Sequence, residues 1–245
     1  MKSLLTVKPK RFDQWRLHAI VCLLLDAGLR IEEALSLRVS DLDLDNLLVT
    51  VFGKGRKERR VPFSTAWTPD GCGAGFSRMT LAMNIRPATP ADHAAIWDIL
   101  ALTIRAGDTY PLPHDMAREE ALNYWFSPAH SVFVAEDDAS VLGTYFIRPN
   151  HRGGGSHVAN CGYVTASSAT GRGVGHAMCE HSLAHAKTRG FRAMQFNFVV
   201  STNERAVRLW QACGFDIVGR LPGAFNHPML GDVDALVMFR SLGQQ

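Results

Sequence analysis

The sequence lacks a long hydrophobic run, a low-complexity segment and paired cysteines. Its longest strongly apolar stretch runs from Ala19 to Leu25, far shorter than the roughly 20 residues that a membrane-spanning helix needs. No small-residue cleavage site follows the basic N-terminal residues, so we expect no signal peptide. These absences predict a cytoplasmic protein with no membrane partner.

The cysteines are odd in number, scattered and never in C-x-x-C spacing: Cys22, Cys72, Cys161, Cys179 and Cys213. This pattern argues against a disulfide framework and against a zinc site. His176, His181 and His185 recur at near-helical spacing, but no second cluster of ligands accompanies them. We therefore interpret them as an exposed helix face and predict no metal.

Charge is unevenly distributed along the chain. Residues 1–64 contain 12 Lys and Arg against 8 Asp and Glu, whereas the remaining residues contain 14 against 15. The basic character therefore belongs to the N-terminal region, and it gives no reason to expect nucleic-acid binding by the larger part.

Residues 65–82 separate two regions of different composition. Gly71, Gly73 and Gly75 fall within five residues, and no helical or alternating periodicity is present. Such a segment is typical of a linker. The predicted organisation is therefore an N-terminal fragment at 1–64, a linker at 65–82 and a C-terminal domain at 83–245. The Thr89–Pro90 pair near the start of that domain is typical of a helix N-terminus.

The N-terminal region predicts two helices, Gln14–Asp26 and Ile31–Arg38, followed by a hairpin. Its segments Ala27–Arg38, Asp41–Asp45 and Gly53–Pro62 resemble the start of a tyrosine recombinase (phage integrase) catalytic domain. The resemblance implies that Arg30 would grip a scissile phosphate and that Lys54 would protonate the leaving oxygen, as cationic groups do in phosphoryl transfer.

The resemblance to recombinases stops near Ser64. The His-x-x-Arg pair and the tyrosine nucleophile that the family requires do not follow. We interpret residues 1–64 as an incomplete fragment, which lacks most of the core partners of its fold. Neither strand cleavage nor DNA binding is expected from it.

The region from Met83 onward predicts a mixed α/β domain of about 160 residues, which is enough for one core. The expected order is a strand, two helices, three strands, a glycine-rich turn, a helix, a strand, a helix and two more strands. The expected ranges are 84–86, 90–106, 116–126, 131–136, 141–147, 158–165, 175–189, 193–199 and 203–212.

The main chemical signal is Thr170-Gly-Arg-Gly-Val-Gly-His-Ala-Met, which follows a predicted strand and begins a predicted helix. Glycines there let the backbone approach a ligand, and the first amides of a helix attract an anion such as pyrophosphate. A Rossmann fingerprint does not fit the preceding element order, and a P-loop lacks its Gly-Lys-Ser/Thr.

Together with Asn203-Glu-Arg-Ala-Val-Arg-Leu-Trp-Gln-Ala-Cys-Gly-Phe, this loop resembles the GNAT acetyltransferase superfamily. The resemblance covers about residues 83–242 and implies a mixed, mostly antiparallel sheet flanked by helices. It also implies acetyl-CoA as co-substrate. The implied cofactor-binding residues are Tyr163, Val164, Thr165, Gly171, Arg172, Gly173, Val174, Gly175, His176 and Asn203.

The sequence departs from the superfamily pattern at two positions. Thr170 stands where Arg or Gln is usual, and Arg172 is the nearby source of positive charge. Trp210 stands where a tyrosine usually protonates the departing thiolate. An indole cannot do this, so either water serves as the acid or the CoA thiolate leaves without one.

Candidate catalytic residues are less clearly marked. Glu136 and His157 are candidates for the general base, with a solvated turn carboxylate and a surface histidine as the alternatives. Cys161 is read as a core residue rather than as a nucleophile. Four further residues are candidates for an acceptor pocket, with core or edge positions as the alternative: Arg86, Tyr110, Trp125 and Asn197.

We expect an N-acetyltransferase that acts on a small primary amine such as an amino acid, a polyamine or an antibiotic-like amine. Acetylation of proteins and non-catalytic CoA binding, the latter with residual DNA binding through the N-terminal fragment, remain alternatives. A homodimer is compatible with either enzymatic hypothesis.

Overall fold

The computed structural model describes residues 83–138 and 140–243, together with Leu29 and residues 31–37, 41–43, 48–52 and 58–62 of the N-terminal region. The chain divides into two compact units, with the main division between Ala82 and Met83. The boundaries predicted at 64 and 82 stay a prediction. Within the described residues, no helix is both long and apolar enough to cross a membrane.

In the N-terminal unit, helix α2 (Ile31–Ser36) precedes a three-stranded antiparallel sheet. Its strands are β1 (Leu42–Asp43), β2 (Leu48–Phe52) and β3 (Glu58–Pro62). The second helix and the hairpin agree with the sequence prediction, whereas β1 was not predicted. The predicted helix Gln14–Asp26 and the residues Arg30 and Lys54 lie outside the described residues.

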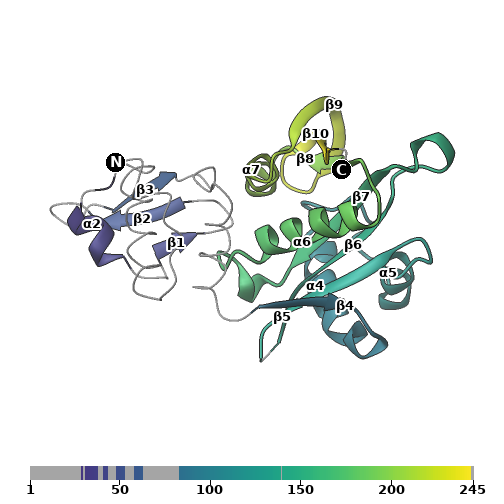
Figure 1. Cartoon of the computed structure of the whole chain (residues 1–245), viewed down its shortest axis with the longest axis horizontal. Coiled ribbons are helices and arrows are strands. Elements are labelled where there is room, and N and C mark those ends of the chain that lie inside the picture. Colours follow the sequence, from purple (N-terminus) through teal and green to yellow (C-terminus); the bar gives the residue numbers. More distant parts are fainter. Residues whose placement is uncertain are drawn as a thin grey trace. The chain divides into compact units, whose positions relative to one another are not determined.

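The C-terminal domain is built on a seven-stranded sheet with the order β4-β5-β6-β7-β8-β10-β9 (Figure 1). Neighbouring strands are antiparallel except for β7 and β8, which are parallel. The strands are β4 (Asn84–Pro87), β5 (Ser131–Glu136), β6 (Val141–Pro149), β7 (Val158–Thr165), β8 (Ala193–Val200), β9 (Asp216–His227) and β10 (Gly231–Ser241). The predicted mixed, mostly antiparallel sheet is therefore confirmed.

Helices cover both faces of the sheet. They are α4 (His93–Ala106), α5 (Arg118–Trp125), α6 (Val174–Thr188) and α7 (Glu204–Ala212). Because side chains alternate along a strand, β6 contributes Tyr145 and Ile147 to the core beneath α6 and α7, and Phe146 to the core beneath α4 and α5. The predicted helix at 90–106 begins as a 3₁₀ turn, Pro90–Asp92, before α4.

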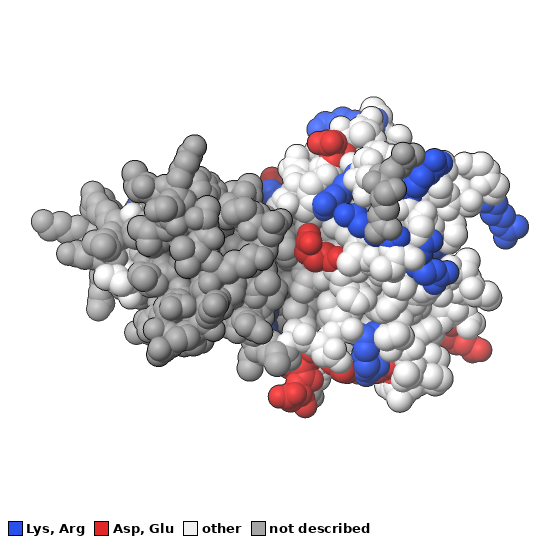
Figure 2. All heavy atoms as spheres, viewed as in Figure 1, with Lys and Arg blue, Asp and Glu red and all other residues white. Residues whose placement is uncertain are grey.

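Charged side chains are dispersed over the C-terminal domain. The visible face carries both Lys and Arg groups and Asp and Glu groups, and the basic groups are more numerous on its upper part (Figure 2). The three described cysteines, Cys161, Cys179 and Cys213, are buried free thiols. No disulfide therefore links any two of these three.

A buried carboxylate joins the start of the domain to its sheet. The Asp92 carboxylate accepts hydrogen bonds from Arg86 Nη1 at 2.8 Å and from the Thr89 amide at 2.7 Å. Arg86 Nη2 also donates to Glu136 Oε2 at 2.7 Å. The hydrogen bond from Arg86, opposed by burial and supported by Thr89, holds the pKa of Asp92 well below its ordinary value.

The Asp92→Asn variant should lose about 2 kcal/mol of unfolding free energy, because it removes charged hydrogen bonds in a buried position. The folded-state pKa of Asp92 is lowered, so its stabilisation is complete above the ordinary carboxyl pKa of about 4 and disappears as the pH falls below that value. Urea unfolding between pH 3 and pH 7 measures the difference. The exposed Asp98 on α4 gives the matched control, Asp98→Asn, which should change little. Equal losses in the two variants would contradict this role of Asp92.

Candidate functional site

Strands β7 and β8 separate soon after they begin. Their ladder consists of two residue pairs, Val158 with Ala193 and Ala159 with Met194. At the next position a side chain replaces the backbone donor of the ladder: Asn160 Nδ2 donates a hydrogen bond to the Gln195 carbonyl oxygen at 2.8 Å. Since a strand edge carries amides and carbonyls that need partners, the separation leaves backbone groups of β7 and β8 facing one another across a gap.

A cavity of about 350 Å³ lies along this separation. Its walls come from the end of α4 and the following loop, from α5, β6, β7 and β8, and from the start of α7. The lining residues are Thr103, Thr109, Tyr110, Pro111, Tyr124, Phe146, Arg148, Asn160, Cys161, Gly162, Tyr163, Val164, Thr165, Phe196, Asn197, Phe198, Val199, Val200, Asn203, Ala206 and Trp210.

Gly162 lets an aromatic side chain approach the middle of β7. A Cβ atom at this position would collide with the hydroxyl oxygen of Tyr110 and would lie 2.6 Å from Phe146 Cε1. The absence of a side chain is therefore a geometric requirement here. Burial raises the pKa of Tyr110 well above its ordinary value, so its phenol stays protonated and neutral.

The opposite face of β7 is anchored to α6. The Tyr163 hydroxyl hydrogen-bonds with Ser182 Oγ at 2.7 Å, and Ser182 Oγ donates to the Cys179 carbonyl oxygen at 2.7 Å. The Tyr163 ring also packs against Trp210 of α7, with centroids 4.8 Å apart. Both helices therefore fix the position of the strand that borders the cavity.

The glycine-rich loop leads directly into α6. Gly171 and Gly173 each have φ of 76°, a left-handed conformation that glycine adopts without a steric penalty. Val174 and Gly175 are buried in the first turn of α6. The first amides of a 15-residue helix are unpaired within the helix and attract an anion.

The predicted cofactor residues fall into two groups. Tyr163, Val164, Thr165 and Asn203 line the cavity. Residues 171–176 form the loop and the first turn of α6 and do not line it. Asn203 Oδ1 also accepts a hydrogen bond from the Ala206 amide at 3.1 Å, so this residue caps α7. Their assignment to cofactor binding stays a prediction.

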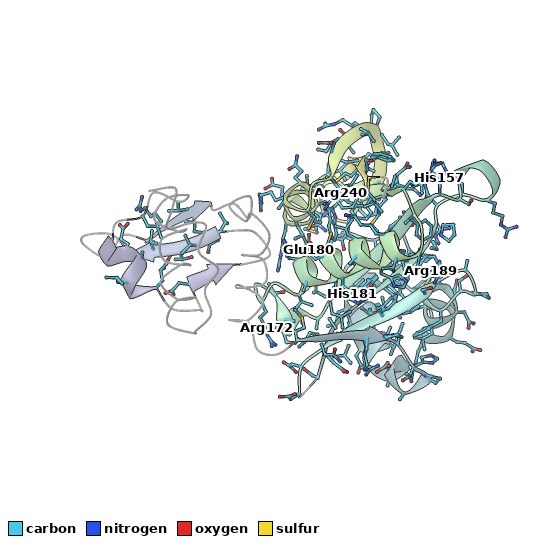
Figure 3. The ribbon with its side chains drawn as sticks, in the orientation of Figure 1. His157, Arg172, Glu180, His181, Arg189 and Arg240 are labelled. Atoms are coloured by element: carbon cyan, nitrogen blue, oxygen red, sulfur yellow. The ribbon has the colours of Figure 1, made fainter. Side chains whose placement is uncertain are left out.

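The two base candidates lie elsewhere. The Glu136 carboxylate, at the end of β5, accepts hydrogen bonds from Arg86 Nε at 3.0 Å and from Arg86 Nη2, which is a structural role. His157 immediately precedes β7 and hydrogen-bonds through Nδ1 with the Gly154 carbonyl oxygen at 3.0 Å. It lies at the end of the domain where α6 terminates (Figure 3). Neither residue lines the cavity.

No carboxylate or imidazole is among the described residues that line the cavity. Burial raises the pKa of the Cys161 thiol to about 12, which opposes formation of a nucleophilic thiolate and agrees with a core role. Of the four acceptor-pocket candidates, Tyr110 and Asn197 line the cavity. Arg86 does not, and neither does Trp125, a buried residue whose Nε1 donates to Thr144 Oγ1.

Sequence reasoning missed Arg148 and Asn160, which face one another across the β6–β7 ladder. The sequence contained an indication for Arg148. Thr144, Phe146 and Arg148 lie on the same face of β6, and an arginine is unusual on a strand face whose other side chains are buried. Asn160 carried no such signal, because its partner Gln195 lies 35 residues away.

The three histidines of α6 are less exposed than the sequence predicted. Each is half-buried: His181 Nδ1 contacts the Tyr145 hydroxyl at 2.6 Å, and His185 packs against Phe133. The interpretation as an exposed helix face was wrong, because two of the imidazole rings contact side chains of the sheet beneath α6. Figure 3 marks His181 and Glu180 on α6.

One group of potential metal ligands lies outside the cavity. Among the described residues, the ligand atoms of His176, Glu180 and Cys213 lie within 4.8 Å of one another. The Cys213 thiol also interacts with the buried Cys179 thiol. The prediction that the protein uses no metal stays a prediction.

Comparison with known proteins finds similarity to two different families. Residues 74–215 match the acetyltransferase (GNAT) family, and residues 1–69 match the phage integrase family. N-acetyltransferase aca1 of Schizosaccharomyces pombe is 32% identical over 137 residues, which make up 49% of this chain and 66% of that protein. Tyrosine recombinase XerC of Xanthomonas campestris pv. campestris is 44% identical over 64 residues, 23% of this chain and 20% of that protein. The chain thus spans less than two thirds of either relative.

Two solved structures illustrate the likeness of the C-terminal domain. A GCN5-related N-acetyltransferase from Kribbella flavida is 41% identical, with a TM-score of 0.63, covering 65% of this chain and 98% of that one. The acetyltransferase yncA from Salmonella typhimurium, solved with acetyl-CoA, is 20% identical, with a TM-score of 0.59, covering 66% and 95%. The second likeness concerns the fold alone. Through the domain that follows its integrase-like segment, this chain belongs to the GNAT acetyltransferase family.

Proposed function

We propose that the C-terminal domain transfers an acetyl group from acetyl-CoA to the primary amine of a small molecule. The separation of β7 from β8 carries this proposal. It creates a strand edge along which an extended chain with amide groups, such as the pantetheine arm of CoA, can add hydrogen bonds. The edge leads toward the glycine-rich loop and the N-terminus of α6, which suit a pyrophosphate.

The orientation of the cofactor follows from the direction of β7. Thr165 is the last residue of this strand, and the chain reaches Gly171 after a single 3₁₀ turn at Ser167–Ala169. The pyrophosphate therefore belongs at the Thr165 end, held by residues 171–176. The thioester would lie farther back along β7, beside Gly162 and Val164, where backbone amides can polarise its carbonyl.

The dimensions of the cavity favour a small acceptor. A space of about 350 Å³ has to hold the acyl end of the cofactor as well as the amine. Its lining includes the phenol of Tyr110 and the partly exposed ring of Tyr124. This favours a small molecule over a protein terminus.

The chemistry we infer is direct attack of the neutral amine on the thioester carbonyl. Because the described lining contains neither a carboxylate nor an imidazole, the proton of the amine leaves through water. The protonated phenol of Tyr110 lies beside Gly162 and can donate a hydrogen bond to charge that develops on oxygen or sulfur. Alignment of two bound reactants supplies much of the rate enhancement in such a reaction.

Incubation with acetyl-CoA, a thiol reagent and a panel of amino acids, polyamines and aminoglycosides should reveal amine-dependent release of CoA. The value of kcat/KM should increase with pH toward the pKa of the amine itself, because the neutral amine is the nucleophile. Measurable acetyl-CoA binding without CoA release for any amine would refute the enzymatic function and leave a CoA-binding module.

The Gly162→Ala variant should impair acetyl transfer, because its methyl group displaces Tyr110 and Phe146 from the floor of the cavity. Overpacking of this kind costs about 1–3 kcal/mol of stability, and we expect kcat/KM to fall by at least about tenfold. Steady-state kinetics and urea unfolding measure the two effects.

Gly154→Ala is the matched control. Nothing lies within 4 Å of a Cβ atom at Gly154, and the residue is exposed. It should keep both activity and stability. An active and stable Gly162→Ala variant would show that the cavity is not where the reaction takes place.

A further inference from the structure

A single charged side chain lines the cavity among the described residues, and it is Arg148. The other titratable groups in the lining are neutral at pH 7. Burial raises the pKa values of Tyr110, Tyr124 and Tyr163 and that of the Cys161 thiol. The cavity therefore carries a net charge of about +1 near neutral pH.

Among the described residues, Arg148 has no ion-pair partner that would explain its position. Its Nε atom is buried and makes no hydrogen bond within the described part of the chain. The imidazole of His130 is neutral as well, because burial and the charge of Arg148 lower its pKa; this ring stacks on Phe146 with centroids 4.0 Å apart. A buried donor of a charged group without an acceptor is costly to a folded protein, and such groups are concentrated where a ligand supplies the acceptor.

Arg148 also lies at a defined end of the cavity. It pairs with Asn160 across the β6–β7 ladder, at the point where β7 and β8 begin to separate. Val164, four residues farther along β7, is about 13 Å from this point, at roughly 3.3 Å per residue. The pyrophosphate end of the cofactor, near Thr165, is thus the far end, and Arg148 lies on the side left for the acceptor.

We propose that Arg148 binds an anionic group of the acceptor, so that the substrate is an amine that also carries a carboxylate or a phosphonate. The inference rests on the proposed acetyl transfer and narrows its substrate class. A guanidinium offers Nε and Nη in a planar fork that matches the two oxygens of such an acid. With the acid held beside Asn160, the amine of a short amino acid reaches toward Gly162 and the thioester. Polyamines and other cationic amines are disfavoured by the same charge.

The test compares amines with and without an acid group, and the rates are corrected for the fraction of neutral amine because the carboxamide lowers the pKa of the amine. Initial rates are measured with a set of amino acids, with the carboxamide of each, and with aminophosphonates of matched chain length. We expect kcat/KM for the best acid to exceed that for its carboxamide by at least about tenfold. The comparison of carboxylate with phosphonate identifies which acid the site prefers.

Arg148→Met removes the charge but keeps an apolar stem, and it should remove the preference for the acid mainly through KM. Arg148→Lys keeps a charge without the fork and should retain part of the preference. Arg152→Met is the matched control, because Arg152 is exposed and does not line the cavity. The affinity for acetyl-CoA should be unchanged in all three variants, which separates an acceptor role from a cofactor role and from misfolding.

Equal rates for the acids and their carboxamides, or a preference that survives in Arg148→Met, would overturn the anion site while leaving acetyl transfer intact. If no amine is acetylated, the proposed function itself fails. Calorimetry then decides the anion site, with N-acetyl amino acids and their amides as probes of the CoA-bound protein. Binding of the acid alone, lost in Arg148→Met, supports the site; equal binding of acid and amide overturns it.

Discussion

The two-pair ladder between β7 and β8 is the constraint on which the rest of this domain depends. A parallel pair would ordinarily continue for the length of both strands, and doing so would satisfy their backbone groups. Here the Asn160 carboxamide donates a hydrogen bond to the Gln195 carbonyl oxygen. The ladder therefore ends without leaving that acceptor unpaired. Beyond this point the sheet is held together on either side of the gap by β6–β7 and by β8–β10.

Such a gap would close if the strands were free to move, and packing on both faces opposes this. Beneath α6 and α7, Tyr163 is fixed by its hydroxyl and by contact with Trp210. On the other face, Gly162 admits Tyr110. The side chains that keep the strands apart are therefore also the ones that line the cavity. Trp210, which cannot replace the usual tyrosine as an acid, still has a structural role as a spacer.

The sequence predicted the order and type of the elements in the C-terminal domain, because buried faces alternate along strands and recur along helices. It also identified the glycine loop, since left-handed backbone at Gly171 and Gly173 requires glycine. It did not predict pairings between distant residues. The binding of Arg86 to Glu136 depends on the β4–β5 register, and the approach of His176 to Cys213 depends on how α6 packs beside α7. For this reason the sequence does not reveal that the carboxylate of Glu136, one of the two candidate bases, accepts hydrogen bonds from Arg86.

The central claim is that acetyl-CoA adds to the free edge of β7 and reaches the start of α6. Hydrogen–deuterium exchange of the 245-residue chain with and without acetyl-CoA measures this most directly. We expect slower exchange at residues 162–165 and 171–176 when acetyl-CoA is bound, with the β9–β10 turn near Met229 unchanged. Unchanged exchange along β7 at saturating acetyl-CoA, or protection confined to another surface, would contradict it.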